Sequence, residues 1–338
     1  MGIKCKLFLM RVAVIGATGL VGSVILKMLE DRNFPVKELL AVSSEESVGK
    51  EIFFQDKKHI LLDLEQAICL SPEIAFFSAE EEISKKWAPI FATIGTIVID
   101  NSSAWRMDNK TKLIVPEINA HILSNKDKII ANPNCSTIQL VMILNPLHKR
   151  YRINRIVIST YQSVTGTGKK SIDQLIAESQ GLSTEKNYPH TIFQNSLPQC
   201  DILESIGCTK EEFKLIKETV KIMDEESIKI NASSVRIPVI GGHAESVNIT
   251  LENDFKLEEL RSLLSKTSGV IVRDDSLNND YPLPIISHGK DEVFVGRLRR
   301  DFSYEKTLNA WIVADNLRKG AAVNAVQIAE YLIENFKF

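Results

Sequence analysis

Short, almost continuously apolar runs alternate with amphipathic segments over the first third of the chain. The apolar runs predict strands at residues 10–15, 38–43, 74–78 and 96–100. Apolar residues repeat at helical spacing over residues 24–29, and residues 84–92 predict a further helix. Strands that are apolar on both faces and alternate with helices predict an α/β fold with a doubly wound parallel sheet.

Longer strands with apolar residues at every second position follow from about residue 132. They are residues 155–161, 246–251 and 292–298. Such alternation is typical of an antiparallel sheet with helices on one face. We therefore predict an α/β domain at residues 1–131 and an α+β domain at residues 132–314. The amphipathic segment 315–338 is predicted to form one long helix that packs back on the first domain.

The 338-residue chain is nearly neutral, with a formal net charge of −2 at pH 7. It lacks the overall positive charge that attracts nucleic-acid phosphates, so we expect no nucleic-acid partner. Hydrophobic residues make up 44% and charged residues 25%, which is ordinary for a globular protein. Every apolar run falls far short of the roughly 20 residues of a membrane-spanning helix, so we also expect no membrane partner.

The five cysteines are scattered along the chain and lack the spacing of metal ligands. They are Cys5, Cys69, Cys135, Cys200 and Cys208. We therefore expect no metal and a reducing, cytoplasmic setting. Because the first predicted strand begins at Met10, residues 1–9 are interpreted as an extension from an upstream start, with Met1 or Met10 as the native start.

A glycine-rich turn, GATGLVG at residues 16–22, connects the first predicted strand to the following helix. Its glycines allow main-chain amides at a helix N-terminus to approach the pyrophosphate of a dinucleotide. The position at the start of an α/β domain favours this interpretation over a glycine turn without a ligand.

A candidate nucleophile lies in residues 132–137. Cys135 follows a short predicted strand and opens a helix. The amides and the dipole of a helix N-terminus favour the thiolate, which is the nucleophilic form. A cysteine taken alone is as often a small buried residue, so the assignment depends on its partners.

His243 is the strongest candidate among the six histidines for proton transfer beside such a cysteine. The strand before it ends in a glycine pair, which is expected to expose both His243 and Arg236. Arg236 is suited to bind a substrate carboxylate, although an arginine at a strand end is more often a solvated surface group. The other histidines are predicted to be surface or hydrogen-bonding residues: His59, His121, His148, His190 and His288.

Six segments, in order, resemble the motifs of the aspartate-semialdehyde dehydrogenase family. They are residues 16–22, 132–137, 161–168 (YQSVTGTG), 218–222 (ETVKI), 236–243 (RIPVIGGH) and 315–322 (DNLRKGAA). The resemblance runs from Met10 to the C-terminus. It implies a dinucleotide-binding domain at 1–131 and a catalytic and dimerisation domain at 132–314. It also implies NADPH-dependent reductive dephosphorylation of 4-aspartyl phosphate to aspartate 4-semialdehyde, a step towards lysine, threonine and methionine.

The resemblance also assigns roles residue by residue. Cys135 is implied to form an acyl thioester, His243 to accept and donate the proton, and Gln162 to orient the acyl group. The residues implied to contact the cofactor are Gly16, Thr18, Gly19, Leu20, Val21, Gly22, Ser44, Glu46, Ser47, Thr165, Gly166 and Asn316.

Further charged and polar residues are implied to hold the substrate. Arg236 matches the arginine that binds the substrate carboxylate, and Glu218 matches the acid that binds its amino group. Arg106 and Lys221 match the phosphate-binding pair, and Asn134 lies beside the reacting group. Charges placed in this way would fix a small zwitterion and its leaving phosphate.

Cofactor preference is where this chain departs from the family pattern. The family usually has an arginine for the 2′-phosphate of NADP where this chain has Glu46, and residues 78–82 are unusually acidic. A carboxylate about 20 residues past the glycine turn normally favours NAD. Ser43, Ser44, Ser47 and Lys50 can instead bind a phosphate, so NADP is the predicted cofactor and NAD stays possible because of Glu46.

Two other functions compete with this interpretation. An N-acetyl-glutamyl-phosphate reductase shares the fold, but its cysteine usually follows Pro-Gly, whereas Asn134 precedes Cys135 here. A non-catalytic dinucleotide-binding relative is expected to have lost Cys135 or His243, and both are present. The expected partners are small-molecule substrates, namely aspartate 4-semialdehyde, 4-aspartyl phosphate and phosphate, and further copies of the chain in a homodimer or dimer of dimers.

Overall fold

The computed structural model describes residues 9–336, which form two compact units. The first unit contains the described chain up to Pro116, Ala120–Asn132 and the chain from Ala322 onwards, and the second contains Glu117–Asn119 and Pro133–Ala321. The α/β fold class predicted from the sequence is confirmed. Cys5 and the alternative start Met1 lie outside the described residues.

A six-stranded sheet forms the centre of the first unit, and its neighbouring strands are all parallel. In spatial order the strands are β2 (Val36–Val42), β1 (Met10–Ile15), β5 (Ile74–Phe77), β6 (Ile97–Asp100), β8 (Ile129–Ala131) and β7 (Lys112–Leu113). β2 lies on one side of β1, and β5 and the later strands lie on the other side. The glycine turn that follows β1 therefore lies at the switch point where open α/β sheets bind ligands.

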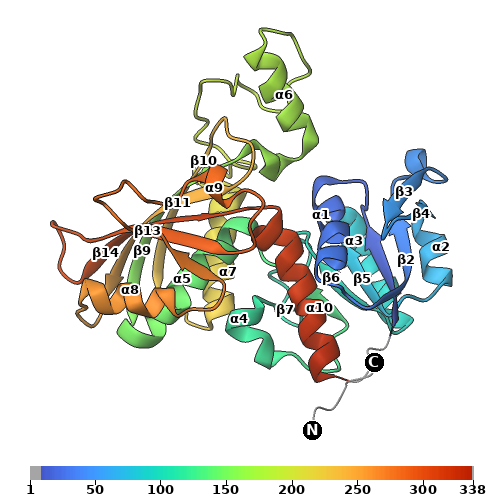
Figure 1. Cartoon of the computed structure of the whole chain (residues 1–338), viewed down its shortest axis with the longest axis horizontal. Helices are drawn as coiled ribbons and strands as arrows, with labels where there is room; N and C mark the ends of the chain where they lie inside the picture. The colour runs from blue at the N-terminus through green and yellow to red at the C-terminus, as the bar shows by residue number, and fades with distance from the viewer. Residues whose placement is uncertain (1–8, 337–338) are drawn as a thin grey trace. The chain divides into compact units, whose positions relative to one another are not determined.

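Helices cover both faces of this sheet (Figure 1). On one face, the apolar residues of α1 (Leu20–Asp31) and α10 (Val323–Asn335) share a core with β1, β5 and β6. α2 (Leu64–Cys69) and α3 (Glu81–Thr93) pack on the other face. A separate hairpin is formed by β3 (Glu51–Phe54) and β4 (Lys57–Ile60).

The C-terminal segment is not the single helix that was predicted at residues 315–338. A π-helical turn, η4 (Arg318–Ala322), comes first, and α10 begins only at Val323. The Asp315 side chain accepts hydrogen bonds from the amides of Leu317 and Arg318, and the amide of Gly320 donates to the Asp315 carbonyl. This wider bonding pattern takes the place of the first turn of a regular helix.

The second unit is built on another six-stranded sheet, and the antiparallel pairing predicted from the sequence holds for only part of it. In spatial order its strands are β10 (Lys229–Arg236), β9 (Ile153–Gln162), β11 (His243–Leu251), β14 (Thr307–Ala314), β13 (Val293–Arg300) and β12 (Val270–Val272). The pairs β10–β9 and β12–β13 are parallel. β9 and β10 can run parallel because the long connection between them contains α6 (Lys169–Ser179) and α7 (Lys210–Met223).

Helices α5 (Cys135–Tyr151), α7 and α8 (Leu257–Ser265) pack against the strands of this sheet. Alternate residues of β11, among them His243 and Glu245, are buried, whereas Ser246 is exposed. Ser136 of α5 accepts a hydrogen bond from Gln162 at the end of β9. Gln139 of α5 donates one to the His243 carbonyl at the start of β11. The first turns of α5 therefore lie beside two strand ends.

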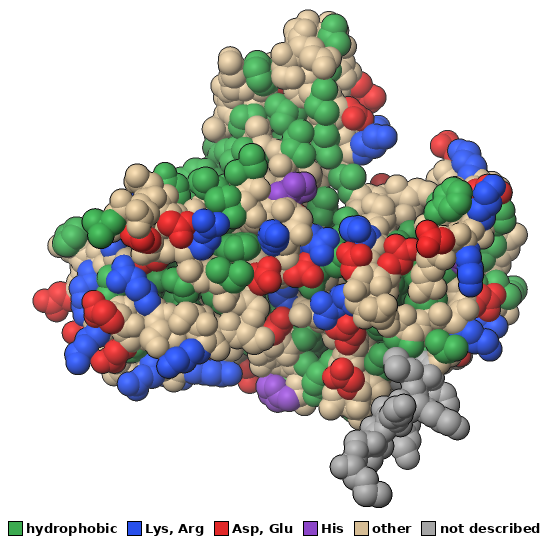
Figure 2. All heavy atoms as spheres, viewed as in Figure 1, with side chains coloured by type: hydrophobic (Ala, Val, Ile, Leu, Met, Phe, Trp, Pro, Cys, Tyr) green, Lys and Arg blue, Asp and Glu red, His purple; other side chains and the backbone are tan. Residues whose placement is uncertain are grey.

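No helix within residues 9–336 is both long and apolar enough to cross a membrane. Over the same residues, no group of three or more His, Cys, Asp or Glu side chains is placed to hold a metal ion. Positive and negative side chains are interspersed over the face shown in Figure 2. This mixture agrees with the nearly neutral charge of the chain.

Candidate active site

Cys135 is the first residue of α5, and its thiol is half-buried. Asn134 caps the helix, since its Oδ1 accepts hydrogen bonds from the amides of Ser136 at 2.9 Å and Thr137 at 3.3 Å. On the other side of the turn, the Asn134 amide donates to Oε2 of Glu218 at 2.7 Å. The cap and the carboxylate fix the main chain on both sides of the thiol, at the end of the helix that favours a thiolate.

His243 opens β11 and is fully buried, so the expectation that it is exposed is wrong. Its Nδ1 accepts a hydrogen bond from the Ser163 amide at 3.1 Å. Its Nε2 has no hydrogen-bond partner among residues 9–336. Burial, together with the positive charge of Arg236, lowers the pKa of His243 to about 3. The imidazole is therefore neutral throughout the physiological pH range.

Arg236 ends β10 and is buried as well, at 3% exposure, contrary to the expectation from the sequence. Its Nη1 donates to the Ser163 carbonyl at 2.7 Å, and its Nε has no partner among the described residues. A Cβ atom placed on Gly166 would lie 2.8 Å from this Nη1 and 3.2 Å from His243 Nε2. Glycine at this position keeps space open beside a buried cation and an imidazole nitrogen, which is a suitable place for an anionic ligand.

Gln162 ends β9, and its Nε2 lies within hydrogen-bonding distance of three oxygens. These are Ser136 Oγ at 3.2 Å, Thr160 Oγ1 at 3.2 Å and Glu211 Oε1 at 3.1 Å. Glu211, on α7, also accepts a hydrogen bond from Asn134 Nδ2 at 2.9 Å. Gln162 is thus held beside the first turn of α5, as its implied role next to Cys135 requires.

The remaining substrate-binding candidates are distributed over both units. Glu218 and Lys221 are three residues apart on α7, which places them on the same side of that helix. Arg106 belongs to the first unit, where its Nε and Nη2 donate to the carbonyls of Asn132 at 3.0 Å and Asn101 at 2.7 Å. These bonds fix the position of the guanidinium group through main-chain oxygens.

The glycine turn has the geometry of a phosphate cradle. Gly16 has a φ of +79°, and a Cβ atom there would lie 2.3 Å from the Ser78 carbonyl oxygen. A Cβ atom on Gly22 would lie 2.1 Å from the Gly16 carbonyl oxygen. Gly19 is the N-cap of α1 and has no side chain to occupy the helix amides. The turn therefore fits the pyrophosphate of a dinucleotide.

The other implied cofactor contacts lie in two separate loops. Glu46 and Ser44 are exposed around η1 (Glu45–Ser47), just after β2. In the second unit, Thr165 Oγ1 donates to Asn316 Oδ1 at 3.0 Å, which links η3 (Val164–Thr167) to the segment before η4. Each unit thus presents part of the predicted cofactor contacts.

Glu245 is a buried acid that the sequence analysis missed. It is fully buried on β11, and neither carboxyl oxygen completes a hydrogen bond with any described residue. Burial is the main cause that raises the pKa of Glu245 well above its usual value, and the charge of Glu211 adds to it, while the nearby Gln139 side chain acts in the opposite direction. Burial therefore favours the protonated, neutral form of the Glu245 carboxyl group.

Three other residues were missed because their contributions leave little trace in the sequence. Ser163 acts through its main-chain amide and carbonyl, and Gly320 through the absence of a side chain. Both residues lie inside motifs, residues 161–168 and 315–322, in which roles were assigned to neighbouring residues only. Glu211 looks like an ordinary acid in the first turn of a helix. Glu245 did leave a signal, since it takes an inward position of an alternating strand.

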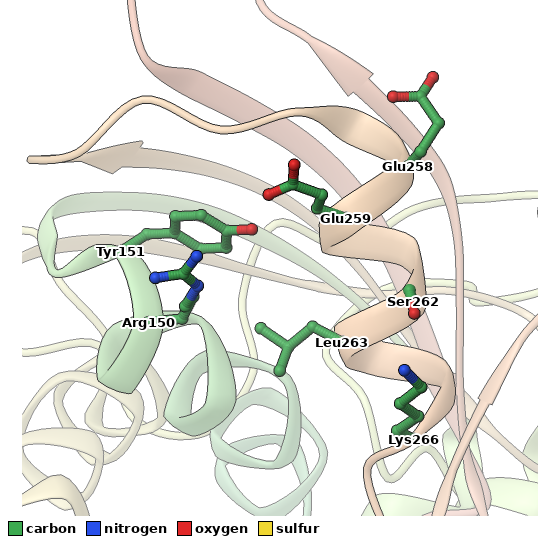
Figure 3. Close-up of a pocket in the computed structure, with 7 residues that line it drawn as sticks. All are labelled: Arg150, Tyr151, Glu258, Glu259, Ser262, Leu263 and Lys266. Atoms are coloured by element: carbon green, nitrogen blue, oxygen red, sulfur yellow. The ribbon is translucent and has the colours of Figure 1, made fainter.

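A hollow of about 470 Å³ lies at the opposite end of α5 (Figure 3). It is lined by Arg150, Tyr151, Glu258, Glu259, Ser262, Leu263 and Lys266. With 1.5 Å of rise per residue, it lies about 24 Å along the helix from Cys135. None of the predicted site residues lines it, so it is separate from the candidate active site.

Two family models match the chain and define its class. The model of the semialdehyde dehydrogenase NAD binding domain matches residues 11–126, and that of the semialdehyde dehydrogenase dimerisation domain matches residues 144–319. The fold and the matched domains are thus those of a semialdehyde dehydrogenase.

Full-length relatives identify the family more narrowly. An aspartate-semialdehyde dehydrogenase of Aquifex aeolicus is 49% identical over 96% of this chain and 98% of that relative. One of Legionella pneumophila is 45% identical over 97% and 96%. The crystal structure of aspartate semialdehyde dehydrogenase II from Vibrio cholerae, complexed with ASA, is 42% identical, covers 98% of this chain and 100% of that chain, and superposes with a TM-score of 0.94.

This chain belongs to the aspartate-semialdehyde dehydrogenase family. The resemblance drawn from its six motifs is confirmed, and so is its classification as an enzyme of this type. The relatives described above favour neither the N-acetyl-glutamyl-phosphate reductase nor the non-catalytic alternative.

Proposed function

We propose that the chain converts 4-aspartyl phosphate to aspartate 4-semialdehyde, with Cys135 as the covalent nucleophile. The observation that carries this proposal is the position of Cys135 at the capped N-terminus of α5, in the same unit as the buried pair Arg236 and His243. A thiolate there attacks the acyl carbon, phosphate leaves, and the acyl group stays on sulfur as a thioester. Gln162 orients that acyl group from the end of β9.

The charged residues bind the ends of the substrate. Arg236 binds the carboxylate, because its buried guanidinium has donors to spare, and Glu218 binds the ammonium group. Arg106 and Lys221 bind the phosphate, and Asn134 lies at the reacting carbonyl. Buried charges of this kind hold a small zwitterion more strongly than exposed ones do.

The cofactor is bound by the glycine turn between β1 and α1, and NADP is the form that we propose. Gly16 and Gly22 leave room for the pyrophosphate, and Thr165 and Asn316 contribute from the second unit. A bound nicotinamide supplies the hydride that reduces the thioester. NADP is favoured because Glu46 is exposed and can turn away from a 2′-phosphate, while Ser44 and Ser47 offer hydroxyl groups.

The same unit that carries Cys135 is also proposed to join two copies of the chain. Residues 144–319 match a dimerisation domain, which supports a homodimer, and a dimer of dimers is the larger assembly that we consider. Cys69, Cys200 and Cys208 are free thiols, which supports a reducing, cytoplasmic setting.

The test is an assay of phosphate-dependent NADP reduction by aspartate 4-semialdehyde. The native chain is expected to turn over, and Cys135→Ala is expected to lose at least about 10³-fold in kcat because no thioester forms. Cys69→Ala, at an exposed thiol in the first unit, is the matched control and is expected to keep full activity. An active Cys135→Ala variant with a native circular dichroism spectrum would refute the assignment.

A further inference from the structure

Three asparagine side chains of the first unit are joined by hydrogen bonds into one asparagine chain. Its members are Asn101, Asn132 and Asn324. Resting on the function proposed above, we infer that this asparagine chain positions Arg106 for the phosphate group of the substrate. Asn324, on α10, is then a positioning residue that acts on Arg106 through Asn132.

Arg106 is held by the main-chain carbonyls of two members of the asparagine chain. Its Nη2 donates to the Asn101 carbonyl at 2.7 Å, and its Nε donates to the Asn132 carbonyl at 3.0 Å. Because a guanidinium group is planar and rigid, these bonds fix both its position and the direction of its plane. The placement of the Arg106 charge therefore depends on the peptide groups that follow Asn101 and Asn132.

These two asparagines follow neighbouring parallel strands of the sheet. Asn101 comes directly after β6 and Asn132 directly after β8, and the last paired residues of these strands are Asp100 and Ala131. The Asn101 amide still donates to the Phe77 carbonyl at 2.9 Å, and the Asn132 amide to the Asp100 carbonyl at 2.7 Å. The next peptide groups, which hold the guanidinium, lie beyond the regular pairing, so their orientation depends on side-chain hydrogen bonds.

The orientations of the three amide groups are determined from both ends of the asparagine chain. At one end, Asn101 Nδ2 donates to the Phe77 carbonyl at 3.1 Å. At the other end, Asn324 Nδ2 donates to the Ile114 carbonyl at 2.9 Å. A main-chain carbonyl can only accept, so each terminal NH2 group is placed by its partner. Between the ends, Asn132 Nδ2 donates to Asn101 Oδ1 at 2.9 Å, and Asn132 Oδ1 accepts from Asn324 Nδ2 at 2.7 Å.

Burial makes each of these bonds difficult to replace. Asn132 and Asn324 are exposed by only 1% and 0%. The amide and Nδ2 of Asn132 donate hydrogen bonds, and its carbonyl and Oδ1 accept them. Solvent has little access at this depth, so loss of the Asn324 amide leaves Asn132 Oδ1 unsatisfied or forces Asn132 to move. A movement of Asn132 displaces the carbonyl that holds Arg106 Nε.

Asn324 lies in the first turn of α10, and the acceptors of its NH2 group lie outside that helix. Ile114 follows β7, and Asn132 follows β8. Asparagine is a poor helix former, so the helix alone does not favour it here. Leucine has a similar branched shape but no N–H group. Asn324→Leu therefore removes both hydrogen bonds while it keeps the volume of the side chain and a good helix former.

The first experiment is steady-state kinetics of Asn324→Leu, with phosphate, aspartate 4-semialdehyde and NADP each varied. The phosphate KM should rise about 5-fold to 10-fold, because a charged hydrogen bond is displaced, and the other two KM values should change by less than about 2-fold. Asn335→Leu is the matched control, since Asn335 is exposed on the same helix and its Nδ2 donates to the Tyr331 carbonyl at 2.8 Å. It should change none of the three values. Equal increases in all three, or none for phosphate, would overturn the inference.

The second experiment tests whether Asn324 acts through Arg106. In that case Asn324→Leu raises the phosphate KM of the native chain but has no further effect in an Arg106→Ala background. A general loss of structure would add its effect in both backgrounds, so full additivity of the two substitutions would contradict the inference. If Asn324→Leu fails to fold, Asn101→Ala, at the half-buried end of the asparagine chain, takes its place with the same expected pattern.

A direct titration separates this inference from the function on which it rests. Isothermal titration calorimetry of inorganic phosphate into the native chain and into Asn324→Leu needs no turnover. The Kd of the variant for phosphate should be about 5-fold to 10-fold higher. An inactive native chain that still shows this difference would refute only the proposed function. An active native chain with the same phosphate affinity as the variant would refute only the inference.

Discussion

The catalytic floor of the second unit and the loop after β2 in the first unit differ in the solvent exposure of their charged groups. By catalytic floor we mean five buried polar or charged residues of the second unit, namely Gln162, Glu211, Arg236, His243 and Glu245. In the loop, by contrast, Glu46 is exposed in a short 3₁₀ turn.

This difference determines how strongly each region depends on a single residue. Charges and hydrogen bonds in a buried site are unscreened and are fixed by their neighbours, so removal of one partner is costly. An exposed carboxylate is solvated and screened, and it can change its rotamer at little cost. Substitutions in the floor should therefore have large effects, and those in the loop small ones.

Apart from the loss of Cys135 itself, the largest effect is expected at Gly320, in the π-helical turn η4. A Cβ atom there would lie 2.9 Å from Cys135 Cβ, and the turn has little freedom to move because the buried Lys319 is bound to Glu117 at 2.7 Å. Gly320→Ala should lower kcat by about 10²-fold, the cost of a small displacement of a reacting group. Wild-type kcat in a folded Gly320→Ala variant would show that Cys135 tolerates the displacement.

The two anion sites should separate in steady-state kinetics. Arg106→Ala and Lys221→Ala should raise the phosphate KM by about 10-fold to 100-fold, since each removes a charged hydrogen bond. Arg236→Ala should instead raise the KM of aspartate 4-semialdehyde. Lys217→Ala, one turn before Lys221 on α7 and exposed, is the control and should change neither value. Equal changes in both KM values would mean that the two sites are assigned incorrectly.

Glu245 should reveal its protonation through the pH dependence of stability. The folded state keeps the proton of Glu245 at pH values where the unfolded chain, with a carboxyl pKa near 4.5, releases it. The native protein therefore loses stability as pH rises through this window, by up to about 1.4 kcal/mol per pH unit. Glu245→Gln lacks this loss.

The measurement is the difference in unfolding free energy between Glu245→Gln and the native chain, taken from pH 4 to 8 in urea. The free energy of unfolding of Glu245→Gln, relative to that of the native chain, should increase as pH rises. It should become constant above the pKa that Glu245 has in the folded protein. Glu258→Gln, in the exposed first turn of α8, is the control and should show no such trend. A flat difference at Glu245 would mean that its carboxyl group is ionised in the folded protein.

The smallest effect is expected in the loop after β2. Glu46→Arg should lower the KM for NADP by about 2-fold to 5-fold and leave that for NAD almost unchanged, because an exposed charge is worth about 1 kcal/mol at most. Glu45→Arg, beside it in the same turn, is the matched control. A native preference for NAD in kcat/KM, or no gain with arginine, would contradict the proposed choice of NADP.

Local sequence signals predicted much of the first unit. Apolar runs predicted the sheet strands β1, β2, β5 and β6, and the glycine turn predicted the β1–α1 connection. Both features depend on neighbouring residues only. The parallel pairing of β9 with β10 was missed, since a crossover that contains two helices leaves no local pattern. The π-helical turn was missed because Asp315 alters the hydrogen bonding of an otherwise helical segment.

The candidate site was predicted residue by residue through its motifs, but its burial was not. The glycine pair before His243 suggested an exposed strand end, whereas both His243 and Arg236 are buried. Burial depends on which strands become neighbours, and that information is not local. The contribution of Ser163 was invisible because main-chain atoms are the same at every position.

The central claim, that Cys135 carries the acyl group, is tested most directly by trapping the thioester. The native chain is mixed with aspartate 4-semialdehyde and NADP in the absence of phosphate, quenched in acid and digested for mass spectrometry. The account predicts a burst of about one NADPH per chain and an aspartyl adduct on the peptide of Cys135 that phosphate removes. Cys200 should stay unmodified, because burial raises the pKa of its thiol to about 12. An adduct on Cys69 or Cys208, or a burst without any adduct, would contradict the account.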